Sequence, residues 1–428
     1  MKRIVPLFLI LILTVCFCGC SAADKNSENV QSGVVPDAGS DIDGLTDVYV
    51  IGERVEGKLA SGEGDSAVPG REGSGNGIQY ASGILTCGEH SDLASLDEFR
   101  ALFEKSEVWK TEAAAYKSYA YDSFKVNVTL ADGAPAFNVP VYLAKGQDGE
   151  TVCIARTDIN GRAVLTVPGL YAGEKDQLVV RVGGVSKPFG DDLAFTVDSG
   201  SEVRSLDLMF MIDTTGSMSD ELEYLKAEFR NVIRRICSAA PEGTAFSVRT
   251  SVNFYRDEGD EYVLRAFDFT DDVSRSLTEL SAQYADGGGD FPEAVHVALE
   301  SMVEHEWRED AVKLCFLVLD APCHSDSEVQ GVSTSINRSL QQAEAQGIRI
   351  IPIASSGITE TAEMLFRSYA VQTNGTYIFL TDHSGVGGEH KDPTDIQDYE
   401  VELLNECMVR VVSEFCGLTY VKAPAPKQ

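Results

Sequence analysis

The spacing of apolar residues changes along the chain and separates two regions with different expected structures. From Phe124 to Val197, apolar and polar residues alternate in short runs, which is typical of half-buried β-strands. From residue 203 onward, near-continuous apolar runs alternate with apolar residues at helical spacing, as in a parallel sheet covered by helices. The pattern predicts a small all-β sandwich at 121–202 and a doubly wound α/β domain at 203–420, each able to fold independently.

Helices and strands of the α/β region follow from the same spacing. Met218 to Ile236 places apolar residues on one face of an expected first helix. The last expected helix presents apolar residues from Val401 to Phe415 and stops at Gly417, a residue favoured at helix C-termini. The apolar runs between helices are expected strands, at 206–212, 246–254, 262–268, 313–319, 349–353 and 376–379.

Short strands are expected throughout the sandwich region. Asp158-Ile-Asn160-Gly161 separates two of them, and Asn-Gly between alternating strands favours a β-hairpin. The alternative is a calcium loop, but no later bidentate Glu stands in register. Pro140-Val-Tyr-Leu and Gly161-Arg-Ala-Val-Leu are similar to Ig-like and carboxypeptidase-regulatory-like modules. The expected strands are 124–130, 139–143, 152–157, 162–167, 178–182 and 193–197.

The N-terminal residues have the pattern of a targeting segment. Lys2 and Arg3 precede an apolar stretch that ends near Val15 and is too short to span a bilayer comfortably. Gly19-Cys20 resembles a bacterial lipobox, so residues 1–19 are expected to be a signal peptide and Cys20 to carry a lipid. This resemblance implies a lipid-anchored, extracytoplasmic protein, with plain secretion as the alternative.

Three further segments flank the two expected domains. Residues 20–80 are rich in Gly, Ser and acidic residues, which predicts a flexible acidic tether. Residues 81–120 contain an apolar stripe from Leu93 to Phe103, so we expect a helical segment that docks on a neighbouring domain or forms an independent hairpin. Residues 421–428 are expected to be a frayed tail.

The charge of the chain excludes some partners. It has 35 basic and 67 acidic residues, with a formal net charge of −32. Neither nucleic acid nor an anionic membrane surface is attracted to such a field. We therefore expect membrane contact only through the N-terminal lipid, while cation binding fits this charge.

Candidate metal ligands follow the first strand of the α/β region. The strand ends at Asp213, and Thr215 and Ser217 stand at alternate positions of the turn that leads to the first helix. One carboxylate and two hydroxyls are hard oxygen ligands that suit Mg²⁺, Mn²⁺ or Ca²⁺. The alternative is a simple helix cap formed by Ser217 and Asp220.

Two more acidic residues are expected at the same edge of the sheet. Asp320 ends the strand at 313–319, and Asp290 lies in Gly287-Gly-Gly-Asp-Phe-Pro-Glu-Ala, just before Pro292 is expected to open a helix. Ligands of open α/β sheets collect at the carboxyl ends of strands. Three loops with oxygen ligands at one edge favour a metal site over three independent caps.

These motifs resemble the von Willebrand factor type A domain over roughly residues 203–420. The resemblance implies a metal-ion-dependent adhesion site in which Asp213, Thr215, Ser217, Asp290 and Asp320 hold a divalent cation, Mg²⁺ or possibly Mn²⁺ or Ca²⁺. Thr215 replaces the middle Ser of the family's Asp-x-Ser-x-Ser turn and keeps the oxygen. Asp290 stands where many members have a neutral Thr, which adds a negative charge.

The site favours binding over catalysis. In the binding hypothesis, an extracellular protein or peptide offers an acidic side chain to the open position of the cation, which implies a non-enzymatic adhesion protein. In the alternative, the cation activates water for hydrolysis, and only His324 or Asp257 could serve as base. No Gly-x-Ser-x-Gly, P-loop or His-Glu-x-x-His motif occurs.

The cysteines reveal no disulfide framework. Seven follow Cys20, an odd number, and none form a CxxC pair, which argues against a zinc site. Cys315 falls within an expected core strand and is interpreted as a small apolar residue.

Overall fold

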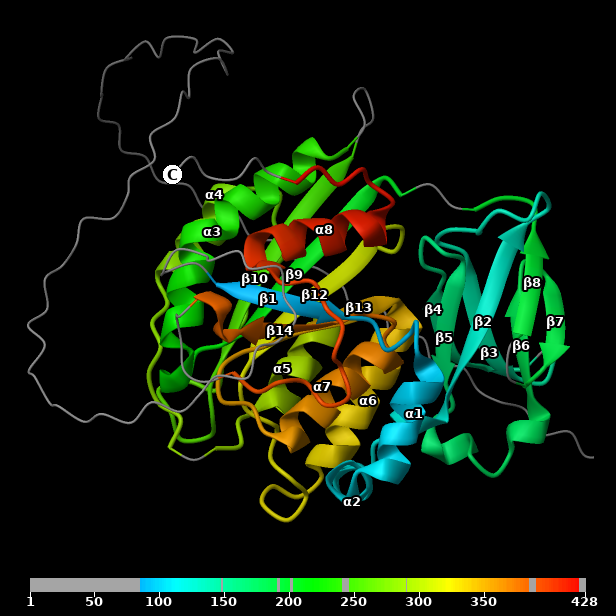
Figure 1. The fold of residues 1–428 in the computed structure, drawn as a ribbon, viewed down its shortest axis with the longest axis horizontal. Coiled ribbons are helices and arrows are strands. Elements are labelled where there is room, and N and C mark those ends of the chain that lie inside the picture. The colour runs from blue at the N-terminus through cyan, green and yellow to red at the C-terminus, as the bar shows by residue number, and fades with distance from the viewer. Residues whose placement is uncertain are drawn as a thin grey trace, which may run out of the picture. The chain divides into compact units, whose positions relative to one another are not determined.

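The computed structural model describes residues 85–422 except 148, 191–192, 201–202, 241–245, 290 and 385–389 (Figure 1). The expected signal peptide, Cys20 and the tether therefore lie outside the described residues, as does most of the expected tail. All described residues belong to one compact unit, Glu72–Gln428.

A central eight-stranded sheet organises most of this unit, in the order β11-β10-β9-β12-β13-β14-β1-β15. Its middle strands run parallel and are buried on both faces, which explains their near-continuous apolar sequences. β11 (Leu264–Arg265) is much shorter than the strand expected at 262–268, and it pairs antiparallel with β10. The parallel strands are β9 (Ser205–Asp213), β10 (Ser247–Tyr255), β12 (Val312–Leu319), β13 (Ile348–Ala354) and β14 (Tyr377–Thr381).

Helices cover both faces of this sheet (Figure 1). Successive residues of β9 alternate between two cores: Leu208 and Phe210 pack with α3 and α8, whereas Met209 and Met211 belong to the core that contains α5, α6 and α7. This arrangement confirms the predicted doubly wound α/β fold. The helices are α3 (Ser219–Ser238), α4 (Val273–Ser281), α5 (Val295–Glu304), α6 (Val332–Gln346), α7 (Glu360–Gln372) and α8 (Leu404–Cys416).

An unexpected strand from the N-terminal region completes the sheet. β1 (Thr86–His90) lies between β14 and β15 (Glu402–Leu403) and is antiparallel to both. It is followed by α1 (Leu96–Lys105) and α2 (Glu107–Ala115), whose apolar side chains join the core of α5, α6 and α7. The sheet is therefore built from two stretches of sequence, and the segment expected to be helical also contains a strand.

The residues between α2 and β9 form the predicted all-β unit. Two small sheets, β5-β2-β8 and β4-β3-β6-β7, share one apolar core. One strand, β7, was not expected from the sequence. The strands are β2 (Ser123–Leu130), β3 (Pro140–Lys145), β4 (Thr151–Arg156), β5 (Arg162–Thr166), β6 (Leu178–Val182), β7 (Val185–Pro188) and β8 (Leu193–Val197).

The expected hairpin at Asp158–Gly161 is wrong, although the turn itself forms. β4 pairs with β3 and β5 pairs with β2, so the turn connects two sheets. The Asp158 carboxylate accepts hydrogen bonds from the backbone N–H of Asn160 and Arg162, both at 2.8 Å, and pairs with the Arg162 guanidinium. Local turn chemistry fixed the bend, whereas packing of the two sheets decided which strands pair.

Two polar side chains of the α/β part bond to the β unit. Asn374 follows α7, and its amide pairs with the backbone N–H and C=O of Val164 at 2.6 and 2.7 Å. Arg349 at the start of β13 donates to the carbonyl of Arg156 at 2.8 Å and is almost fully buried. These bonds lie beside an apolar contact, since Val164 of β5 also belongs to the core of α5, α6 and α7.

Candidate functional site

The turn after β9 buries an acidic residue with one unpartnered oxygen. Asp213 is fully buried, and its Oδ1 accepts hydrogen bonds from the Thr215 N–H at 2.8 Å and the Thr215 hydroxyl at 2.7 Å. Its Oδ2 is buried with no hydrogen-bond partner among the described residues. Burial, with a further contribution from Asp320, raises the pKa of Asp213 to about 7. A buried carboxylate in this state lacks a compensating positive charge.

The structure brings Asp320 and Ser217 to the same strand-end region. Asp320 directly follows β12, and burial raises its pKa to about 6, while the hydrogen bond from the exposed Ser217 hydroxyl acts in the opposite direction. Glu221 of α3 also raises the pKa of Asp320; its Oε1 accepts from the Ser356 hydroxyl at 2.8 Å. Thus Asp213, Thr215, Ser217 and Asp320 lie together at the carboxyl ends of β9 and β12.

Asp290 lies outside the described residues, but its loop approaches the turn after β9. The Gly216 N–H donates to the Gly287 carbonyl at 3.3 Å. Gly288 has a positive φ of 73°, and a Cβ there would lie 3.0 Å from both Thr215 Cβ and Glu293 Oε1. Only glycine fits this close approach without strain. The helix after this loop begins at Val295 rather than at the expected Pro292, so Glu293 belongs to the loop.

Glu293 is a site residue that the sequence did not single out. It is 3% exposed, and its Oε2 has no hydrogen-bond partner in the described part of the chain. Burial, together with the nearby charges of Asp213, Asp257 and Asp320, raises its pKa to about 9. The signal was present in Gly-Gly-Asp-Phe-Pro-Glu, where a second acidic residue follows Asp290 by three positions.

The hydroxyl of Tyr255 is buried in the same region as the carboxylates of Asp213 and Glu293. It pairs with Asp213 in the register of β10 and β9, and it is fully buried. Burial raises the pKa of the Tyr255 hydroxyl well above its usual value, as do the charges of Asp213 and Glu293. The hydroxyl has no hydrogen-bond partner among the residues that the structure covers. The Tyr255 hydroxyl and the Asp213 carboxylate also act on each other's pKa values, so these two buried groups are neighbours, and Glu293 Oε2 is a further buried oxygen without a partner among the described residues.

His324 and Asp257, considered above as possible bases, bond to each other. His324 Nε2 lies 2.7 Å from Asp257 Oδ1, and both side chains are buried. Asp257 is one of the charges that act on Glu293. The pair therefore lies close enough to the candidate site for its charge to act there. The hydrogen bond to Asp257 orients the His324 imidazole.

The oxygen atoms at these strand ends fit a hard divalent cation. Asp213 Oδ2 is the strongest indication, because a buried carboxylate oxygen without a partner is costly. Within the described ranges, no three His, Cys, Asp or Glu side chains are grouped so that they alone could hold a metal ion. A cation would therefore depend on the hydroxyls of Thr215 and Ser217 as well as on carboxylates.

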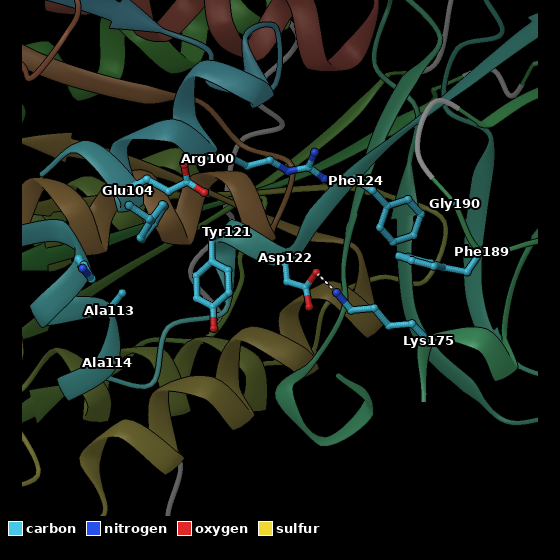
Figure 2. Close-up of a pocket in the computed structure, with 12 residues that line it drawn as sticks. Arg100, Glu104, Ala113, Ala114, Tyr121, Asp122, Phe124, Lys175, Phe189 and Gly190 are labelled. Carbon is cyan, nitrogen blue, oxygen red and sulfur yellow. Dashed lines mark hydrogen bonds and ion pairs between the residues drawn. The ribbon is translucent and has the colours of Figure 1, made fainter. Parts of the chain in front are cut away.

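A separate cavity of about 630 Å³ lies away from these residues (Figure 2). It is lined by α1, α2 and the start of the β unit, with Phe103, Tyr121 and Phe124 on its walls and the ion pair of Lys175 and Asp122 at its side. None of the candidate metal ligands lines it.

One comparison with known proteins supports a domain in this region. Residues 207–382 match the family model of the von Willebrand factor A domain, which supports such a domain in this part of the chain. Among solved structures, the chain is similar to the conserved hypothetical protein BatB from Bacteroides thetaiotaomicron. The TM-score is 0.32 and the identity 11%, over 50% of this chain and 98% of that chain. No curated protein matches the chain.

Among the helices that the structure describes, none combines the length and apolar composition needed to cross a membrane.

Proposed function

We propose that the protein is a surface-anchored binding protein whose von Willebrand factor A domain recognises its partner through a divalent cation. Asp213, Thr215, Ser217 and Asp320 supply oxygen ligands, and Asp290 supplies another from the second loop. The observation that carries this proposal is Asp213 Oδ2, a fully buried carboxylate oxygen without a partner. A bound cation would give it the missing positive charge.

The partner follows from the charge of the protein. A chain with a net charge of −32 repels an acidic partner at long range. A cation with one open coordination position overcomes this repulsion at the site, because it attracts a carboxylate directly. We therefore infer that the partner is an extracellular protein or peptide that presents an Asp or Glu side chain, and that the protein is a binding protein and not an enzyme.

Cation binding is tested by thermal unfolding of the full chain with Mg²⁺, Mn²⁺ or Ca²⁺ against chelator. Binding at a hundredfold excess over Kd stabilises the folded state by about 2.7 kcal/mol, so the melting temperature should rise by several degrees. Asp213→Ala should abolish this rise, and Thr215→Val should weaken it, because a methyl group replaces a ligand oxygen.

Two neighbouring residues provide matched controls. Asp220→Ala removes an exposed carboxylate from the first turn of α3. Thr214→Val removes a hydroxyl that bonds the Tyr255 carbonyl at 3.0 Å and the Tyr262 hydroxyl. Both should keep the cation-dependent rise. If Asp213→Ala also kept it, the cation would bind elsewhere and the turn would be only a helix cap.

Anchoring through Cys20 belongs to the same proposal and is supported by the lipobox-like Gly19-Cys20. Mass spectrometry of membrane-extracted protein should find a lipid on Cys20 as the first residue. Unmodified protein recovered only from the medium would contradict this.

A metal-assisted hydrolase is the second candidate, and the bonded pair of His324 and Asp257 favours it. An imidazole held by a buried carboxylate, as His324 is by Asp257, is a common general-base arrangement. Turnover of a model ester or peptide that is lost in both His324→Gln and Asp213→Ala would support the hydrolase over the binding protein.

A further inference from the structure

Two thiols from opposite ends of the described chain lie in one core. Cys87 is in β1 and Cys407 is in α8, and both are fully buried in the apolar cluster beneath α3 and α8. About 320 residues separate them in sequence, so only the completed fold brings them together.

The backbone contacts of β1 fix where α8 begins. Cys87 pairs with Glu402 in the register of β1 and β15, and the Leu404 N–H donates to the Leu85 carbonyl at 3.0 Å. Cys407 follows Leu404 by three residues, nearly one helical turn, and therefore faces the same side of α8. The helix places Cys407 over the strand that carries Cys87.

The two thiols interact with each other. Interaction with the Cys87 thiol, together with burial, raises the pKa of Cys407 well above its usual value. Arg410, one turn later on α8, donates to Cys407 Sγ at 3.7 Å. The two thiols thus lie together in the buried core, with the Arg410 guanidinium at its edge.

The other described cysteines have different surroundings. Cys153 donates to the Thr166 carbonyl at 3.5 Å, and Cys323 lies 3.8 Å from the Tyr369 hydroxyl. Cys416 is near Arg349, Cys315 is within β12, and Cys237 is exposed on α3. Cys87 and Cys407 are therefore the cysteines whose placement fits a cross-link.

We propose that Cys87 and Cys407 form a disulfide when the chain folds in an oxidising compartment. The S–H bonds of both residues break, one S–S bond forms, and two protons and two electrons pass to the disulfide of a thiol–disulfide oxidant, which is reduced to two thiols. In a reducing compartment the two residues remain the free thiols of the structure.

Formation of this bond must accompany folding. Both thiols are fully buried, so an oxidant cannot reach them once α8 covers β1. The raised pKa of Cys407 also keeps the reactive thiolate scarce in the folded state. The bond therefore forms before or while β1 docks, and afterwards it resists reduction.

Refolding of the reduced, unfolded full chain with oxidised glutathione tests the proposal. After denaturation and alkylation without reductant, trypsin should release peptides 72–100 and 392–410 joined to each other, since each contains one cysteine. Recovery of both peptides separately alkylated, or joined to another cysteine peptide, would overturn the proposal.

Thermal unfolding separates a cross-link from a packing effect. The melting temperature of the oxidised full chain should fall by about 5–10 °C when it is refolded in reductant. Cys237→Ala, which changes an exposed thiol, should show the same difference between oxidised and reduced samples. Cys87→Ala and Cys407→Ala should each show none, and an oxidised–reduced difference retained in either variant would contradict the proposal.

Discussion

Burial changes the protonation of one carboxylate, that of Asp213. It is fully buried at the end of β9, and its pKa is raised to about 7. Such a carboxyl group is neutral at low pH and costs folding energy when it ionises without a cation. A cation removes this cost, since it favours the ionised form.

The pH dependence of the metal-free protein follows from this shift. An unfolded Asp titrates near pH 4, whereas folded Asp213 holds its proton up to about pH 7. The folded state therefore binds more protons in this window, so stability falls as the pH rises from about 4 to 7, and Asp213 alone contributes on the order of 4 kcal/mol to this fall. Urea unfolding in chelator should show this fall.

Two changes should flatten this profile. Asp213→Ala removes the titrating group, and saturating divalent cation should hold the carboxylate ionised and stabilise the protein more at pH 8 than at pH 5. A metal-free profile as steep in Asp213→Ala as in the unchanged protein would assign the effect to Glu293 or Asp320, whose pKa values are also raised.

At this scale the sequence identifies candidate site residues that share a motif and misses those that only the fold assembles. Asp213, Thr215 and Ser217 stand in one turn, and Asp320 ends a readable strand, so their positions could be predicted. Tyr255 looks like any strand tyrosine until the register of β10 places it beside Asp213. Glu293 could be assigned to the loop only once the structure showed that α5 begins two residues later.

Among the elements, β1 is the one that local sequence could not reveal. Thr-Cys-Gly-Glu-His has neither the alternation of an exposed strand nor the apolar run of a buried one. Its identity as a strand comes from β14 and β15, which pair with it from far along the chain. The long buried strands β9 and β12 could be predicted from their local sequence alone, because their apolar runs are unambiguous.

Gly88 makes the fit of β1 testable. A Cβ at this position would lie 2.5 Å from Cζ of the buried Phe379 and 2.7 Å from the Tyr399 ring. Gly88→Ala should therefore destabilise the folded state by about 1–3 kcal/mol in urea unfolding. Gly173→Ala is the control, since no described atom lies within 4 Å of a Cβ there. Equal stability of the two variants would mean that β1 does not pack against β14 as described.

At the level of the whole molecule, the β unit is an insertion between two parts of one sheet. β1, α1 and α2 precede it, and β9 follows it. The change of apolar spacing predicted the two regions themselves. It could not reveal that residues 85–118 belong to the later sheet, because that assignment depends on pairing and packing over almost 300 residues.

The two parts should differ in how well they fold as separate fragments. Residues 120–202 contain a complete core of their own and should fold alone. Residues 203–420 should melt at a lower temperature than 85–422 and bind a hydrophobic dye, because β14 and β15 lose β1 and the core of α5, α6 and α7 loses α1 and α2. Circular dichroism melting curves give the comparison, and equal melting temperatures would show that β1 contributes little.

The place of β1 in the sheet also determines when the sheet can be completed during synthesis of the chain. Thr86 emerges early from the ribosome, but its partner Thr381 follows almost 300 residues later. At 5–20 residues per second, β1 waits roughly 15–60 s before its partner exists. Closing so long a loop is also slow in refolding. The completed sheet therefore cannot form during most of synthesis, whereas the β unit, which has a core of its own, can fold before β14 exists.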